Sequence, residues 1–447
     1  MDIDSYQEKI ISKVREDINN LKSQKINLSK SALAYYALWG SNVGFEKLKF
    51  KIFGISRLYS LIKYYLKDAL SVLNNMDFQF NTKFKNFKRN KLFISIAHKK
   101  DFNENGSFTD RYFKINSKNY KDFLFILIYL DKDIPRAIDE NIVIYYKKKS
   151  SFVRNLLFFL KLYIKKIIFF PPLSKKIIHE LSYQSIYAEM FFDKIKKNIN
   201  FKEIDFIFMP YEGQPFQQFI FQESKKINKN IINYGYEHSA PHSIPIHLYY
   251  RNGAPDILFV NGKSQIEHLT TYMDWPKESL KLVPTLRYQS INHDDFSNYL
   301  FLPYEIFDEK LILKELENYL KNLKNNSLNK INVKIHPVAP NIDSQKNIKL
   351  KIEKLFDKYS YKFSQSRIDN DISIFVGPTT GVIVALEKSL KVLHICFDPI
   401  FDSYSETLWP KLSVKKVSSN TLEYFLKTKE EFLLFKNEEN IFEKYYN

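Results

Sequence analysis

The chain has 447 residues, and its 68 Lys and Arg against 50 Asp and Glu give a formal net charge of +18. This length exceeds what one hydrophobic core usually organises, so we expect two or three compact units. Hydrophobic residues make up 45% of the chain and charged residues 26%, which excludes wholesale disorder and a polytopic membrane protein. The single cysteine, Cys396, excludes a disulfide scaffold and indicates a reducing compartment.

The first twenty residues, MDIDSYQEKIISKVREDINN, lack the basic and then apolar layout of a signal peptide, so we expect a cytoplasmic protein. The positive charge favours anionic partners, which include nucleic acid, an acidic membrane face and phosphate-bearing or carboxylate-bearing substrates. The lysines are spread along the chain and do not form one reading module, which argues against nucleic acid.

The N-terminal part of the chain alternates between two patterns. Residues 1 to 75 place apolar side chains at helical spacing, which predicts helices. Short β-branched runs at 91 to 98 and 141 to 146 predict strands, and the apolar run at 120 to 130 fits a helix or a strand. This alternation is typical of βα units that build a parallel sheet.

Residues 147 to 176, KKKSSFVRNLLFFLKLYIKKIIFFPPLSKK, are both basic and apolar. Arg154, Lys161, Lys165 and Lys166 interrupt the apolar run too often for a comfortable bilayer span. A basic amphipathic helix with Phe and Leu is typical of an interfacial membrane anchor or a partner-binding helix. Packing on the protein itself, with the lysines reaching solvent, explains the same pattern equally well.

The rhythm of strand, polar loop and helix becomes clear from residue 204 onwards. Strands are predicted at 204 to 210, 230 to 236 and 254 to 262, and helices follow the first and the third. The polar stretch 288 to 299 predicts a linker. Beyond it the pattern predicts helices at 308 to 323, 343 to 358 and 382 to 390 and strands at 331 to 337, 371 to 377 and 391 to 397.

These elements predict two Rossmann-like doubly wound α/β domains that face a central cleft. We assign residues 1 to 288 to an N-terminal domain with a helical extension, and residues 289 to 425 to a C-terminal domain. Residues 426 to 447 are expected to form a C-terminal helix that packs back on the first domain.

Ligands of open parallel sheets bind at the carboxyl ends of the strands, so the loops there carry the candidate residues. Glu212 lies in such a loop between Tyr211 and Gly213, and its carboxylate suits a general base. His336, followed by Pro337, can donate to a phosphate or protonate a leaving group. Taken alone, Glu212 is equally a surface acid, and His336 is more often a structural histidine.

The third loop is Gly377-Pro378-Thr379-Thr380-Gly381, which follows a predicted strand and opens a predicted helix. Two hydroxyls at a helix start favour an anion such as a phosphate. Plain helix capping by threonine is the alternative.

The order of these motifs resembles the bacterial sialyltransferases and polysialyltransferases, and more distantly the Kdo transferases and the glycerophosphotransferases of teichoic acid synthesis. The resemblance spans about residues 204 to 400 and implies a GT-B type fold. It implies that Glu212 is the general base on the acceptor hydroxyl, that His336 contacts the phosphate of CMP, and that Thr379 and Thr380 hold this phosphate. It also assigns acceptor binding to the N-terminal domain and nucleotide-sugar binding to the C-terminal domain, and makes Tyr211 and Gly213 substrate-binding candidates. Tyr211 stands where a second acid is usual in that family.

The loop 237 to 242 carries further substrate-binding candidates, namely His238, Ser239 and His242. His238 is also a second candidate for the base. A zinc site at His238, His242 and His247 is not expected, because Pro241 and Pro245 interrupt any helix that would align them and no cysteine completes the set.

The resemblance implies an inverting glycosyltransferase that moves a sialic-acid-like sugar or Kdo from a CMP-sugar to a bacterial surface glycan, in capsule or lipooligosaccharide. It implies no metal ion and no cofactor beyond this co-substrate. The expected partners are the nucleotide sugar and a glycan or glycolipid acceptor. Residues 147 to 176 are expected to contact the anionic inner face of the cytoplasmic membrane. One alternative keeps the fold with a UDP-sugar, GDP-sugar or CDP-polyol donor. Another is a non-catalytic basic protein that binds a membrane or nucleic acid.

Overall fold

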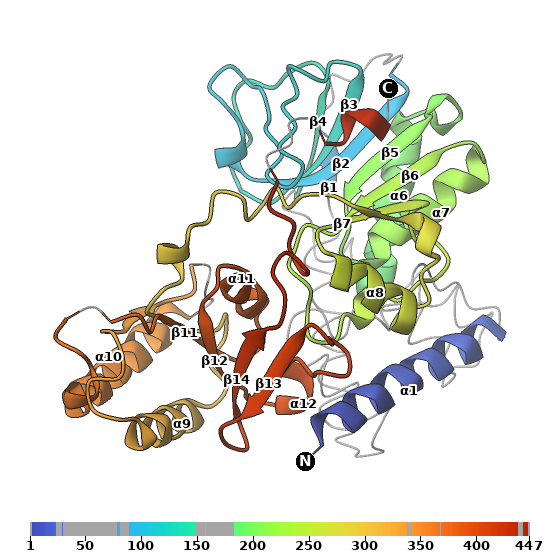
Figure 1. Ribbon diagram of the computed structural model, residues 1–447. Coiled ribbons are helices and arrows are strands. Elements are labelled where there is room, and N and C mark those ends of the chain that lie inside the picture. Colours follow the sequence, from blue (N-terminus) through green and yellow to red (C-terminus); the bar gives the residue numbers. More distant parts are fainter. Residues whose placement is uncertain are drawn as a thin grey trace.

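The computed structural model describes residues 2–23, 29, 78–80, 89–147, 157, 183–337, 339, 341–366, 368–436 and 441–445. Almost all of the basic stretch 147 to 176 and the helices expected between residues 24 and 75 lie outside these residues. The described part of the chain is α/β, with two sheets (Figure 1).

The first sheet has eight strands in the order β1-β4-β3-β2-β5-β6-β7-β8. Its strands are β1 (Phe78–Phe80), β2 (Lys91–Ala97), β3 (Phe123–Tyr129), β4 (Ile142–Lys147), β5 (Phe206–Pro210), β6 (Ile232–Tyr236), β7 (Ile257–Val260) and β8 (Leu280–Leu282). Seven of them are parallel, and β1 pairs antiparallel with β4 at the edge. The predicted strands at 91 to 98, 141 to 146, 204 to 210, 230 to 236 and 254 to 262 are confirmed, and the run at 120 to 130 is a strand.

Both faces of this sheet are buried, because its side chains alternate between two hydrophobic clusters. Along β5, Ile207 and Met209 face one cluster and Phe208 faces the other. The first cluster also takes in helices α6 (Tyr183–Asn198), α7 (Pro215–Ile227) and α8 (Lys263–Tyr272). Such two-sided burial explains why these strands are apolar at nearly every position.

The second sheet has six strands in the order β10-β9-β11-β12-β14-β13. They are β9 (Tyr299–Phe301), β10 (Asn332–Lys334), β11 (Ile372–Val376), β12 (Lys391–Ile395), β13 (Leu412–Lys416) and β14 (Thr421–Leu426). The first four in the sheet order are parallel, whereas β14 and β13 continue it antiparallel. This sheet is therefore mixed, and its two antiparallel strands were not among the predicted elements.

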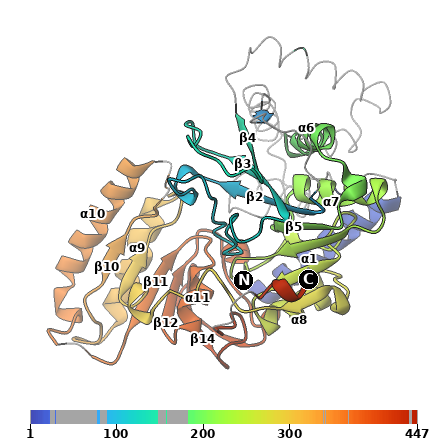
Figure 2. The ribbon, with the colours of Figure 1, turned by 90° about the horizontal axis from the view of Figure 1, so that it is seen from above.

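The second sheet separates two cores. Helices α9 (Glu309–Asn322) and α10 (Ile342–Lys358) pack side by side on one face (Figure 2). Helix α11 (Gly381–Glu387) lies on the other face, within the same hydrophobic cluster as the first sheet. The short helix α12 (Pro399–Asp402) follows β12. The two sheets thus share one continuous core.

Both ends of the chain cross between the two sheets. Helix α1 (Ile3–Ser23) lies beside α8 and α12 (Figure 1). The segment after β14 returns to the first sheet, where Leu434 donates to Asn261 O (2.7 Å) and the Tyr234 hydroxyl donates to Tyr445 O (2.8 Å). The expected helix over 426 to 447 is wrong for the described residues. They run as irregular chain to a 3-10 turn at Glu443–Tyr445. Backbone N–H groups at 430, 432 and 433 donate to the Glu387 carboxylate of α11, and that of Leu434 donates to the first unit, so these groups are not available for a helix.

Within the described ranges, no helix combines the length and the apolar character that crossing a bilayer requires.

Candidate active site

A small pocket opens where β2 and β5 end side by side. The chain turns outwards in opposite directions from these two strands, to β3 and β4 on one side and to β6, β7 and β8 on the other. This is the topological switch point, at which open α/β sheets bind ligands. The wall of the pocket has both apolar and polar residues. The apolar ones are Ile94, Ile96, Ile128, Met209, Pro210 and Phe216, and the polar ones are Ser95, Tyr112, Glu212, Gln217 and His238.

Glu212 is held in this wall by the start of helix α7. Gln217 Oε1 accepts from the backbone N–H groups of Glu212 and Gln214, both at 3.0 Å, and its Nε2 donates to Pro210 O at 2.6 Å. The Gln214 side chain donates to Glu212 Oε2 at 2.7 Å. Burial raises the pKa of the Glu212 carboxyl, although the Gln214 hydrogen bond and the charge of Arg287 oppose the shift.

His238 faces the same carboxylate from the end of β6. Its Nε2 lies 3.5 Å from Glu212 Oε1, and its ring packs against that of Tyr112 with centroids 4.0 Å apart. Burial and then the charge of Arg287 lower the pKa of His238 well below its usual value. The imidazole is therefore neutral at physiological pH.

A second carboxylate, Glu237, lies one residue before His238 and is 2% exposed. The backbone N–H of Ser239 donates to its Oε1 at 3.1 Å, and its Oε2 has no hydrogen-bond partner among the described residues. Burial, and next the charge of Glu212, raise the pKa of Glu237 well above its usual value. Two neighbouring carboxyls in one buried site disfavour double ionisation, so the proton stays on Glu237.

Arg287 supplies the positive charge of this region from the loop after β8. Its guanidinium lowers the pKa values of Glu212, Glu237 and His238. It also lies over the ring of Tyr288, 5.3 Å from the ring centroid. A cation at the rim of a site with two carboxyls offsets part of their repulsion.

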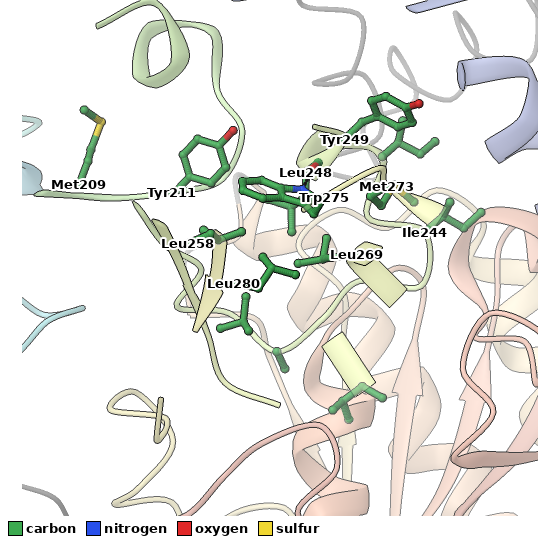
Figure 3. Close-up of a cluster of buried hydrophobic side chains, with 14 of the residues drawn as sticks. Met209, Tyr211, Ile244, Leu248, Tyr249, Leu258, Leu269, Met273, Trp275 and Leu280 are labelled. Carbon is green, nitrogen blue, oxygen red and sulfur yellow. Dashed lines mark hydrogen bonds between the residues drawn. The ribbon is translucent and has the colours of Figure 1, made fainter. Parts of the chain in front are cut away.

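Two residues that the sequence placed at the substrate have structural roles. Tyr211 is fully buried, and Figure 3 shows it beside Trp275 in a hydrophobic cluster (ring centroids 6.4 Å apart). Gly213 has φ +64°, and a Cβ there would lie 2.0 Å from His247 O. Neither is among the residues that line the pocket, and both shape the Glu212 loop.

His242 and Ser239 lie on the loop that carries His238, and both are partly exposed. The His242 ring packs edge-on against that of His247, with centroids 5.2 Å apart. Burial lowers the pKa of His242 to about 4, so its ring is neutral.

The predicted phosphate loop lies at the end of β11 in the second sheet. Gly377 has φ +67°, and its carbonyl lies 2.7 Å from His394 Nε2, which donates to it. The Thr379 hydroxyl oxygen accepts from Gly381 N–H at 3.1 Å, whereas the Thr380 side chain makes no capping hydrogen bond. Pro378, Thr379 and Thr380 are partly exposed.

His336 and Pro337 follow β10, at the same edge of the second sheet. The His336 ring packs edge-on against Tyr304, with centroids 5.4 Å apart, and burial lowers its pKa. Strands β10 and β11 are separated by β9, so His336 and the Thr379 loop stand about 10 Å apart at strand spacing.

The loops of the two sheets meet at Tyr404. Its buried hydroxyl lies 2.8 Å from Pro241 O and 3.4 Å from Thr379 O, so it donates chiefly to the first. The loop of His238 and His242 and the loop of Thr379 are therefore direct neighbours. His336 makes no contact with the Glu212 pocket that the structure records.

Sequence reasoning did not single out Tyr112, Gln214, Gln217, Glu237 or Arg287 as functional. Glu237 had a signal, since it directly follows a predicted strand next to the Glu212 strand. Gln214 and Gln217 stand at helix-capping spacing. Tyr112 and Arg287 lie in irregular loops, where no periodicity points to them. Within the described residues, no three His, Cys, Asp or Glu side chains gather as a metal ion would need.

Comparison of the sequence with models of known protein families finds no match, and comparison with curated protein sequences finds no significant relative.

Proposed function

We propose that the protein is a metal-independent glycosyltransferase of GT-B architecture that transfers an acidic sugar from a CMP-sugar to a bacterial surface glycan. One observation carries the proposal. The Tyr404 hydroxyl lies against both Pro241 O and Thr379 O, so a buried acid–base site on one α/β sheet adjoins a glycine-bounded hydroxyl loop on the other. Transfer between two substrates requires two such adjoining sites, one for each substrate.

In this proposal the acceptor sugar enters the pocket beside Glu212. The Glu212 carboxylate takes the proton of the acceptor hydroxyl while that oxygen bonds to the anomeric carbon of the donor sugar. The bond from this carbon to the CMP phosphate oxygen breaks, and its electron pair leaves with CMP. A single displacement of this kind inverts the anomeric centre.

The donor nucleotide is assigned to the carboxyl edge of the second sheet. The partly exposed hydroxyls and backbone N–H groups of the loop Gly377–Gly381 suit the phosphate, whose charge grows as the bond breaks. His336, at the end of β10 at the same edge of the sheet, is assigned to the CMP phosphate, whose departure it assists. We propose an acidic glycan or glycolipid as the acceptor and a cytoplasmic location at the inner membrane face.

The test combines a nucleotide panel with a substitution of the base. We expect CMP to raise the melting temperature more than UDP, GDP or CDP, since a ligand that binds only the folded state stabilises it. Glu212→Gln should lower kcat by about 10²- to 10⁴-fold, the usual contribution of a general base, and should leave the CMP shift unchanged. Glu267→Gln, an exposed glutamate on α8, is the matched control.

Near-wild-type turnover of folded Glu212→Gln would contradict the base assignment. A larger shift with UDP or GDP would move the donor to that nucleotide. No response to any nucleotide would argue for a protein that is not a nucleotide-sugar enzyme.

A further inference from the structure

The Glu212 carboxylate is approached from two sides by side-chain nitrogens. Gln214 Nε2 donates to Oε2 at 2.7 Å. His238 Nε2 lies 3.5 Å from Oε1, slightly longer than a hydrogen bond. In structures without substrate such contacts are often long and shorten only in the reacting complex. Glu212 Oε1 therefore has His238 as its neighbour, and this residue comes from the loop that follows β6.

The ring of His238 is held in place, and only its Nε2–H tautomer can donate to Glu212. The ring is 2% exposed and packs on Tyr112 with centroids 4.0 Å apart, which fixes its plane. Its Nδ1 has no hydrogen-bond partner among the described residues, although the backbone of Tyr236 interacts with the ring and opposes the lowering of the His238 pKa. A neutral imidazole has one N–H group, and the nearby carboxylate favours the tautomer that carries it on Nε2.

We propose that His238 is a positioning residue for Glu212, and that its Nε2–H donates to Glu212 Oε1 while Tyr112 holds the ring in place. This inference deepens the proposed function and rests on it for the role of Glu212 as the base. Together with Gln214, it leaves the carboxylate with one fixed orientation and with lone pairs free for the acceptor proton. No proton passes through the imidazole in this role.

A donor to the ionised carboxyl favours ionisation, so His238 keeps Glu212 deprotonated against the effect of burial. The other charged or titratable groups that act on this pair are Glu237 and His242 from the loop after β6, Arg111 and Tyr112 from the loop after β2, and Arg287 from the loop after β8. Substitution of His238 leaves all of these in place. The change in Glu212 ionisation can therefore be assigned to the lost donor.

The experiment compares His238→Ala, His238→Gln and His238→Asn in the full chain. The side-chain nitrogen of Gln reaches the position of Nε2, whereas that of Asn reaches only the position of Nδ1. The first readout is the titration midpoint of the Glu212 carboxyl, followed by NMR of protein with ¹³C-labelled glutamate and assigned with Glu212→Gln. The second is the pH profile of kcat/KM. His293→Gln, on the half-exposed 3-10 turn before β9, is the matched control.

We expect His238→Ala and His238→Asn to raise the Glu212 midpoint by about one pH unit, the scale of a lost hydrogen bond to the charged form. The acidic limb of kcat/KM should move by the same amount, and kcat should fall about 10-fold or more through lost orientation. His238→Gln should restore the Glu212 midpoint and the acidic limb of kcat/KM.

An unchanged Glu212 midpoint in folded His238→Ala overturns the inference. Equal rescue by Asn and Gln also overturns it, because the role depends on Nε2. The NMR midpoint needs no substrate, so it separates the two proposals. A shifted midpoint in a protein that transfers no sugar would retain the Glu212–His238 interaction and reject the glycosyltransferase.

Discussion

At the scale of single residues, burial raises the pKa of several carboxyl groups around the pocket. Asp110 is fully buried beneath the pocket, where Ser95 donates to its Oδ2 at 2.5 Å. The backbone N–H groups of Tyr112 and Phe113 donate to its Oδ1 at 2.8 and 2.6 Å. Asp110 thus fixes the turn that presents Tyr112 to His238. Burial nevertheless raises the pKa of Asp110 to about 6, because these three hydrogen bonds offset only part of the lost hydration.

This shift predicts a pH dependence of stability that belongs to Asp110. The pKa in the folded state, about 6, lies above the unfolded value of 3.8, so protonation favours the fold. The contribution is fully present below pH 4 and is lost as the pH rises through 6. Asp110→Asn, which resembles the protonated acid, should remove this dependence.

Urea unfolding of both proteins between pH 4 and 7.5 measures the effect. The free energy of unfolding of wild type relative to Asp110→Asn should fall as the pH rises through this window. Other raised carboxyls, such as Glu212 and Glu237, are common to both proteins and cancel. A constant difference would contradict the burial argument.

At the scale of elements, helix α1 connects the two sheets. Its apolar side packs in the shared core through Ile10, Ile11, Val14 and Ile18. Gln7, fully buried, donates from Nε2 to Ile400 O (2.8 Å) and Ser403 O (2.7 Å) beside α12. Further along the helix, Arg15 pairs with Asp274 after α8 at 2.8 Å. One helix therefore contacts the second unit at its start and the first unit near its middle.

Gln7→Ala should lower the free energy of unfolding by about 1 to 3 kcal/mol, because two buried carbonyl groups lose their donor. Denaturant unfolding measures the loss. Limited proteolysis should also cleave the segment 398 to 405 faster in the variant. Lys9→Ala, an exposed position on the same helix, is the control. Equal stability of the two variants would show that α1 does not hold the second unit.

At the scale of the whole molecule, the two sheets share one hydrophobic cluster and do not meet only through a polar cleft. Trp409, which is fully buried, lies at this junction. It stacks on His268 of α8 with centroids 4.2 Å apart, and its Nε1 donates to Ser243 O at 2.8 Å. Loops of both sheets that carry candidate site residues are therefore placed by the same core. We expect the two units to unfold together.

Trp409→Ala should lower the free energy of unfolding by about 3 to 5 kcal/mol, the usual range for a buried tryptophan.

The shared core also predicts how the protein loses protection from hydrogen exchange, followed by mass spectrometry. Strands β6 and β7 should lose protection at the same denaturant concentration as β12 and β14. Phe425→Ala, 42% exposed on β14, is the control and should leave protection unchanged. Loss of protection in one sheet alone would contradict the shared core.

Several elements were predictable because their patterns are local. Strands buried on both faces need apolar residues at nearly every position, as in FIFMP of β5 and ISIFV of β11. The amphipathic helices α9 and α10 likewise match their predicted ranges within a few residues. By contrast, β8 and β9 have three residues each, too few for a periodic signal. The hairpin of β13 and β14 was missed because no element was predicted between residues 398 and 425.

Part of the candidate site could likewise be predicted from the sequence, and part could not. Its strand-end position and the residues Glu212 and His238 followed from the sequence, because the carboxyl ends of parallel strands meet at one edge. Tyr211 was misplaced, since a strand-end residue can point into the core as readily as into a pocket. Glu237 and Arg287 matter through charges that act across separate loops, and no spacing encodes such distances.

The sequence by itself determined an α/β chain with strand-end loops bearing Glu212, His238 and the two threonines, since strand and helix periodicity record which faces are buried. Only the tertiary structure decided that Glu212 and His238 face each other across 3.5 Å, that Tyr404 joins the loops of both sheets, and that His336 stands apart from the pocket. The physical reason is that burial, charge and contact at this site arise between strands and loops far apart in the chain, whose distances are set by packing of the shared core.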